Sequence, residues 1–76
     1  MVTAFILVAT SSCSSYEIRD LMLEIDAVEE AHVVFGQYDL IVKAEVLDSE
    51  ELGKLVFGEI RSIDCVISTA TLTVLP

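Results

Sequence analysis

Two segments of this chain carry polar groups that suit the binding of a small zwitterion. One is a turn built on a glycine, whose freedom at positive φ lets the backbone approach a ligand closely. Exposed amides in such a turn can hold a carboxylate, whereas the second segment offers hydroxyl groups that both donate and accept hydrogen bonds. The residues concerned are Gly36, Gln37, Tyr38 and Asp39 in the turn, and Ser68, Thr69 and Thr71 in the second segment.

Each of these residues also has an ordinary structural interpretation, and the sequence leaves both interpretations open. Asp39 suits a ligand's ammonium group, but it equally suits a hydrogen bond to its own turn. Tyr38 offers a ring that either walls a pocket or packs at a rim. Gly36 fits a plain hairpin turn, and threonine is a common residue in any strand.

No residue pattern in the chain indicates catalysis. His32 is the one histidine, and we find no nucleophile or carboxylate partner fixed beside it, so we expect a satisfied or exposed strand residue. Cys13 lies in a polar loop, where a thiol can react, but no Cys-x-x-Cys motif supports that role. Cys65 suits a small buried position, and the two cysteines lack metal-ligand spacing. We therefore predict a non-enzyme without catalytic residues, metal or cofactor.

Charge and composition indicate the cellular compartment of the protein and argue against nucleic acid and membranes as its partners. The net charge is −9 with only four basic residues, a balance that phosphate backbones and anionic membranes repel. The longest apolar stretch, Ala4–Ala9, is far shorter than the ~20 residues that span a bilayer. No signal-peptide pattern is present at the N-terminus. We therefore expect a cytoplasmic protein with both thiols reduced.

Hydrophobic periodicity predicts four strands and two helices. Ser14 and Glu17 form a capping box that starts the first helix, and Asp48 with Glu51 starts the second. The helices are recognised by apolar stripes at helical spacing. The first stripe consists of Ile18, Leu21, Met22, Ile25 and Val28, and the second of Leu52, Leu55, Val56, Ile60 and Ile63. The predicted strands are Val2–Ala9, Ala31–Phe35, Leu40–Val46 and Ser68–Leu75.

The order β-α-β-β-α-β predicts an α+β fold, the ferredoxin-like plait, as one domain over residues 1–76. Its four-stranded antiparallel sheet has both helices on one face. The first strand is apolar on both faces, and 54% of the residues are hydrophobic, so the second face needs a cover. We expect two sheets to pack together, in a dimeric α/β-barrel type of association. The polar alternates that we expect at the rim of this face, or lining a site between subunits, are Lys43, Glu45, Thr69, Thr71 and Thr73.

The stretch Val28–Lys43, in which a Gly-x-Tyr-Asp turn leads into an apolar strand, resembles the effector domain of the Lrp/AsnC family of prokaryotic transcription regulators. The helix Leu52–Ile63 and the last strand, Val66–Leu75, resemble the same domain. The resemblance implies dimers through the sheets, rings of four or five dimers, and an amino-acid effector bound between dimers near the turn and the last strand. It favours the ligand-binding interpretation of Thr69 and Thr71.

In that family a helix-turn-helix DNA-binding domain precedes the effector domain, whereas Met1 falls here at the start of the first strand. The resemblance therefore implies a stand-alone form, sometimes called a RAM domain. Such a chain would sense an amino acid, contact no nucleic acid directly, and modulate full-length regulators through mixed assemblies. The sequence departs from the family in the loop Thr10–Ser14, and it has Ala27 and Cys65 where glycine is frequent.

Two other functional classes share this fold. Plait dimers include small monooxygenases and isomerases, which usually need a His, Asp or Trp cluster, whereas this chain has no Trp and one His. ACT-like regulatory modules share the element order and bind amino acids. They carry a Gly-rich turn after the first strand, which Thr10–Ser14 is not.

Overall fold

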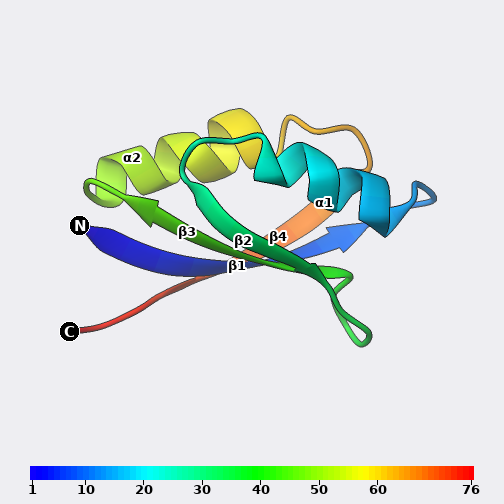
Figure 1. The fold of residues 1–76 in the computed structure, drawn as a ribbon, viewed down its shortest axis with the longest axis horizontal. Coiled ribbons are helices and arrows are strands. Elements are labelled where there is room, and N and C mark those ends of the chain that lie inside the picture. Colours follow the sequence, from blue (N-terminus) through cyan, green and yellow to red (C-terminus); the bar gives the residue numbers. More distant parts are fainter.

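Two helical segments cover one face of a four-stranded sheet in the computed structural model, which describes residues 1–76 (Figure 1). The sheet order is β2-β3-β1-β4, and each neighbouring pair is antiparallel. The predicted ferredoxin-like plait is confirmed. Its elements are β1 (Val2–Thr10), α1 (Ser15–Leu23), β2 (Val28–Val33), β3 (Leu40–Val46), α2 (Ser49–Gly53) with its continuation η1 (Lys54–Ile60), and β4 (Val66–Thr73).

The core lies between the sheet and the helices. Alternate side chains of β1 and β3 point toward the helices and are buried, because strict alternation gives each of these strands one continuous apolar face. The predicted bounds of β3 are confirmed residue for residue. The core side chains of the two central strands are Ala4, Ile6, Val8, Leu40, Val42, Ala44 and Val46, and those of the helices are Ile18, Met22, Leu55, Val56 and Ile60.

The first helix is shorter than its apolar stripe predicts. Ile18 and Met22 are buried, but Leu21 is about half exposed and Val28 already belongs to β2. The nine-residue helix makes barely more than two turns, so Ile18 and Met22 are its only buried residues, and Val28 reaches the core from β2. Ser14 is the N-cap as predicted, but its side chain makes no capping hydrogen bond. The predicted capping box is therefore wrong.

The second helix begins as predicted and then widens. Asp48 Oδ1 accepts a hydrogen bond from the Glu51 N–H at 2.9 Å, which confirms the predicted cap. From Lys54 the helix takes the π form, in which each N–H reaches five residues back. The Arg61 N–H, for example, donates to the Val56 carbonyl at 2.9 Å.

The π segment keeps the central residues of the predicted stripe in the core. Leu55, Val56 and Ile60 are all buried. Leu52 and Ile63 are only partly buried. The stripe predicted from α-helical spacing is therefore correct at its centre and incomplete at its ends.

The last strand runs earlier in the sequence than predicted, and its threonines face the other way. Thr69 and Thr71 pair with Val8 and Ile6, whose side chains are buried beneath the helices. Directly opposite residues of paired strands share a face. The threonine row therefore lies on the helix side of the sheet, and the prediction that it shares the open face with Lys43 is wrong.

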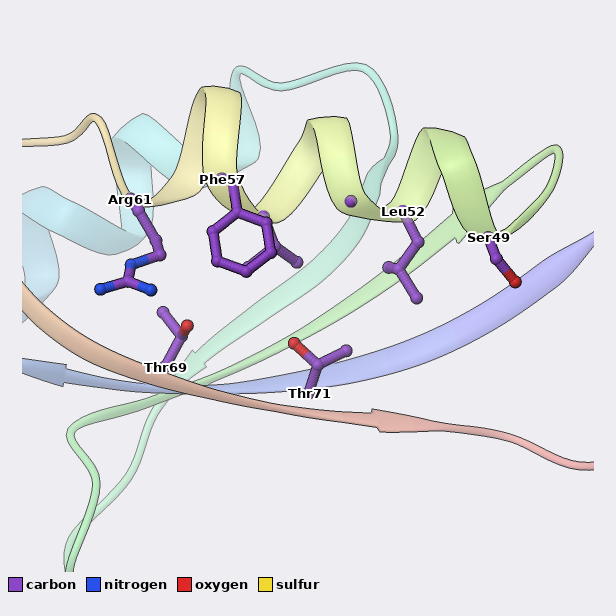
Figure 2. Close-up of a pocket in the computed structure, with 8 residues that line it drawn as sticks. Ser49, Leu52, Phe57, Arg61, Thr69 and Thr71 are labelled. Carbon is purple, nitrogen blue, oxygen red and sulfur yellow. The ribbon is translucent and has the colours of Figure 1, made fainter.

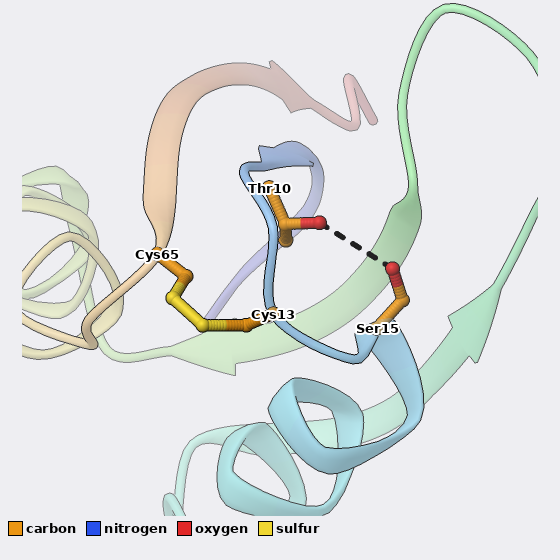
Figure 3. Close-up of a disulfide and its surroundings, with 4 residues drawn as sticks. All are labelled: Thr10, Cys13, Ser15 and Cys65. Carbon is orange, nitrogen blue, oxygen red and sulfur yellow. Dashed lines mark hydrogen bonds between the residues drawn. A yellow bond between two sulfur atoms is a disulfide. The ribbon is translucent and has the colours of Figure 1, made fainter.

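A disulfide joins Cys13 to Cys65, whose Cα atoms lie 6.0 Å apart (Figure 3). The prediction of two reduced thiols is therefore wrong. Antiparallel pairing of β1 with β4 brings Thr10 beside Val66, so the loop after β1 meets the turn before β4 across a sequence separation of 52 residues. That proximity depends on the sheet and leaves no local signal in the sequence.

Candidate functional site

A groove of about 350 Å³ opens between β4 and the second helix (Figure 2). Thr69 and Thr71 point into it from β4, and the Phe57 ring and the Arg61 guanidinium reach toward them from the helix. The volume falls within the range of small-molecule sites in proteins. The remaining lining residues are Ser49, Leu52, Gly53 and Val56.

Arg61 is the one basic residue of this chain without an internal carboxylate partner. Arg19 pairs with Asp20, while Lys43 and Lys54 each lie within 4 Å of two glutamates. The Arg61 guanidinium instead lies 5.5 Å from the centroid of the Phe57 ring, which holds the cation by its π face. A guanidinium whose donors are free is well suited to a carboxylate ligand.

The rest of the groove offers the other kinds of contact that an amino acid needs. The Thr69 and Thr71 hydroxyls can donate to a carboxylate or accept from an ammonium group. Leu52 and Val56 supply an apolar wall for a hydrophobic side chain. Sequence reasoning found the threonines but missed Arg61 and Phe57. One signal was available, because Arg61 is one of only four basic residues in a chain of net charge −9.

The Gly36–Asp39 turn lies beyond the β2 and β3 ends and lines none of the cavities of the chain. Gly36 has a φ of 152°, a conformation that favours glycine, so the predicted role of this residue in the turn is confirmed. Gln37 is exposed and Tyr38 is partly buried. The turn projects from the domain at the tip of the β2–β3 hairpin (Figure 1).

Asp39 ties this turn to the end of β1. Its Oδ2 accepts a hydrogen bond from the Thr10 N–H at 2.8 Å, and its own N–H donates to the Val8 carbonyl at 2.9 Å. The carboxylate thus bonds to a neighbouring strand rather than to its own turn. Oδ1 has no partner in the chain, so an ammonium contact at that oxygen stays a prediction.

One chain does not bring the predicted site residues together. Thr69 and Thr71 lie on the helix side of β4, whereas Ser68 pairs with Ala9 and faces the opposite side of the sheet. The turn adjoins β3, which is separated from β4 by β1. No cavity of the chain is lined by both the threonines and the turn.

The open face of the sheet carries a small charged cluster beside its apolar residues. His32 Nε2 lies 3.0 Å from Glu30 Oε1, and Lys43 Nζ lies 3.8 Å from both Glu29 Oε1 and Glu30 Oε2. The hydrogen bond to His32, followed by the charge of Lys43, holds the pKa of Glu30 below 4.5. The expectation that no carboxylate lies beside His32 is wrong, because residues two apart on a strand share a face.

No group of three or more His, Cys, Asp or Glu side chains is placed to hold a metal ion. No helix combines the length and the apolar character needed to cross a bilayer.

Comparison with known proteins identifies the family. A family model described as the Lrp/AsnC ligand binding domain matches residues 3–76. The chain belongs to the Lrp/AsnC family. An uncharacterized helix-turn-helix-type transcriptional regulator of Pyrococcus furiosus is 33% identical over 73 residues, which cover 92% of this chain and 49% of the relative. The chain thus spans about half the length of the curated Lrp/AsnC relatives that it matches.

Several solved structures superpose closely on this chain. A hypothetical protein from Pyrococcus horikoshii is 37% identical with a TM-score of 0.92, over 100% of this chain and 92% of its own. The protein FFRP-DM1 is 37% identical with a TM-score of 0.93, over 99% of this chain and 100% of its own. Two regulators solved with L-methionine share the fold. The one from Neisseria meningitidis is 19% identical with a TM-score of 0.89, over 99% of this chain and 50% of its own. The one from M. tuberculosis is 20% identical with a TM-score of 0.86, over 100% of this chain and 51% of its own.

Proposed function

We propose that this Lrp/AsnC domain senses an amino acid and that the groove beneath its second helix is one half of the binding site. The observation that carries the proposal is Arg61, an unpaired guanidinium that faces Thr69 and Thr71 across the groove. The ligand carboxylate pairs with Arg61, and the threonine hydroxyls take the remaining polar contacts. The two distant neighbours that hold L-methionine support an amino acid as the ligand class.

The other half of the site comes from a second chain. The Gly36–Asp39 turn projects away from the groove of its own chain, and Asp39 Oδ1 and the turn amides remain available to a ligand. Ser68, on the opposite face of β4, contributes only if the partner chain reaches that edge. Binding between chains links ligand occupancy to assembly, because a ligand that contacts both chains stabilises their association.

The open sheet face supports the assembly that this site needs. Phe5, Leu7, Ile41 and Leu72 lie on it, and the exposure of Leu72 reaches 56%. Burying such side chains between two sheets contributes about 1.5–3 kcal/mol for each large residue. We propose a dimer through these faces and a ring of four or five dimers, an octamer or decamer.

We further propose a stand-alone regulatory domain that acts without enzymatic activity. The chain covers 92–100% of three solved relatives, so domains of this length exist in the family. Such a domain modulates full-length regulators by joining their assemblies through the same sheet face. A cytoplasmic location stays a prediction that follows from this role.

A thermal-shift screen of the purified chain against the standard amino acids tests the proposal. A ligand at one hundred times its dissociation constant adds about 2.7 kcal/mol of stability, which raises the Tm of so small a domain by several degrees. Arg61→Gln and Thr71→Val should abolish the shift. Arg19→Gln, which removes a guanidinium that already pairs with Asp20 outside the groove, is the matched control. A shift that survives Arg61→Gln would place the ligand elsewhere, and no shift with any amino acid would count against the sensing role.

A further inference from the structure

The turn that joins η1 to β4 connects the two walls of the groove. Arg61, at the end of the helix, and Thr69, on the strand, both line the groove. Cys65 lies midway, four residues from each. Cys65 therefore lies at the middle of the short segment that links Arg61 to Thr69.

Two bonds hold Cys65 in an unfavourable backbone conformation. Its carbonyl accepts a hydrogen bond from the Ser11 N–H at 2.8 Å, and its sulfur is bonded to Cys13 in the loop after β1 (Figure 3). Its φ is 76°, a left-handed backbone conformation that residues other than glycine disfavour. The backbone preference of Cys65 therefore opposes the turn, and the disulfide and the hydrogen bond hold it.

The disulfide is accessible to small thiols. Cys13 is exposed and Cys65 is partly buried, and exposed disulfides are the ones that thiols reduce most readily. A thiolate of a small dithiol attacks one sulfur and forms a mixed disulfide. The second thiolate of the dithiol then attacks this mixed disulfide and releases the remaining protein thiol. The dithiol is thereby oxidised to its own disulfide, and Cys13 and Cys65 together gain two electrons and two protons and become two thiols.

We propose that Cys13 and Cys65 form a thiol–disulfide switch that sets the affinity of the groove. In the oxidised chain the turn is cross-linked, so Arg61 and Thr69 are held in facing positions before a ligand arrives. In the reduced chain the ligand must order this turn, and that ordering weakens binding. The inference rests on the proposed amino-acid site, but it concerns the geometry of the turn and is testable without a ligand.

The test compares the oxidised chain, the chain reduced with dithiothreitol, and Cys13→Ser. This variant removes the cross-link at an exposed loop position and leaves the backbone of Cys65 unchanged, and Ser12→Ala in the same loop is the matched control. Hydrogen exchange of the amides from Arg61 to Thr69 is measured first. We expect faster exchange in the reduced chain and in Cys13→Ser, with the exchange of β3 unaltered.

Calorimetry then measures the Kd for L-methionine, or for the standard amino acid with the largest thermal shift. We expect reduction and Cys13→Ser to weaken binding at least about fivefold, the lower end of typical coupling between two sites. Equal exchange rates in the oxidised and reduced chains would overturn the switch. If the chain keeps two free thiols after incubation with oxidised glutathione, the disulfide does not form, and that result would also overturn it. An equal Kd despite different exchange would also overturn it. If no amino acid binds in either state while exchange differs, the proposed ligand fails and the redox control of the turn stands.

Discussion

The Asp39 carboxylate accepts a hydrogen bond from the backbone N–H of Thr10, 29 residues earlier in the chain, at 2.8 Å. This bond fastens the projecting hairpin to the last residue of β1. Ala9 and Thr10 are also where the pairing of β1 with β4 shifts register, so the contact lies where the regular sheet ends. The acid of the Gly-x-Tyr-Asp turn therefore has a structural role, whatever it contributes to a ligand.

Asp39→Ala should lower the free energy of unfolding by about 1–3 kcal/mol, because it leaves the part-buried Thr10 N–H without its acceptor. Asp39→Asn keeps a side-chain oxygen and should cost less. Urea denaturation measures both, with the exposed Asp26→Ala as control. Equal stabilities of the Asp39→Ala and Asp26→Ala variants would show that the bond contributes nothing.

The two helix starts give a matched pair of cap variants. Asp48→Ala should destabilise the chain by about 0.5–2 kcal/mol, because it removes the bond to the Glu51 N–H. Ser14→Ala should change stability by less than about 0.5 kcal/mol, since the Ser14 side chain makes no cap bond. Chemical denaturation of both variants in one buffer compares them, and an equal loss from the two would contradict the difference between the caps.

Two glycines should respond in opposite directions to alanine. A Cβ at Gly58 meets no atom within 4 Å, so Gly58→Ala should stabilise the chain by about 0.4–1 kcal/mol. Gly36 also has open space, but its φ of 152° makes Gly36→Ala costly by about 1–3 kcal/mol. Thermal unfolding monitored by circular dichroism distinguishes them. Stabilisation by Gly36→Ala would show that the turn adopts another conformation in solution.

The disulfide closes a long loop and should stabilise the oxidised chain. A sequence separation of 52 residues corresponds to about 4 kcal/mol in the chain-entropy description. Cys13→Ser without reductant should lose stability of this order, while in dithiothreitol it should match the reduced wild-type chain. Denaturant midpoints under the two conditions measure the difference. A variant as stable as the oxidised wild type would show that the bond contributes no stability.

The charged cluster on the open face makes stability depend on pH in the acid range. Because the folded-state pKa of Glu30 lies below 4.5, its contribution is fully present above pH 4.5 and is lost as pH falls through the folded-state value. His32→Ala removes the largest cause and should raise the pKa of Glu30 toward 4.5. Carboxyl NMR titration measures it, and Lys54→Ala, on the distant helix, should leave it unchanged. An unaltered Glu30 pKa in His32→Ala would mean that the Glu30–His32 bond is absent in solution.

Local patterns in the sequence determined the order of the elements. Alternation over Leu40–Val46 gave a strand with correct bounds, and Asp48 three residues before Glu51 gave a cap that the structure contains. The Gly-x-Tyr-Asp turn placed the hairpin and pointed to the family. These features depend on residues within a few positions of one another, so short-range periodicity and turn chemistry are sufficient to find them.

The tertiary structure alone decided which groups meet. A period of two divides β4 into two faces but does not say which face the helices cover, so the side on which Thr71 lies followed only from its pairing with Ile6. Arg61 lines the groove because the second helix lies over the β4 edge of the sheet. Cys13 is bonded to Cys65 because β1 and β4 are antiparallel neighbours. Such contacts arise from long-range register and packing, for which no local sequence signal exists.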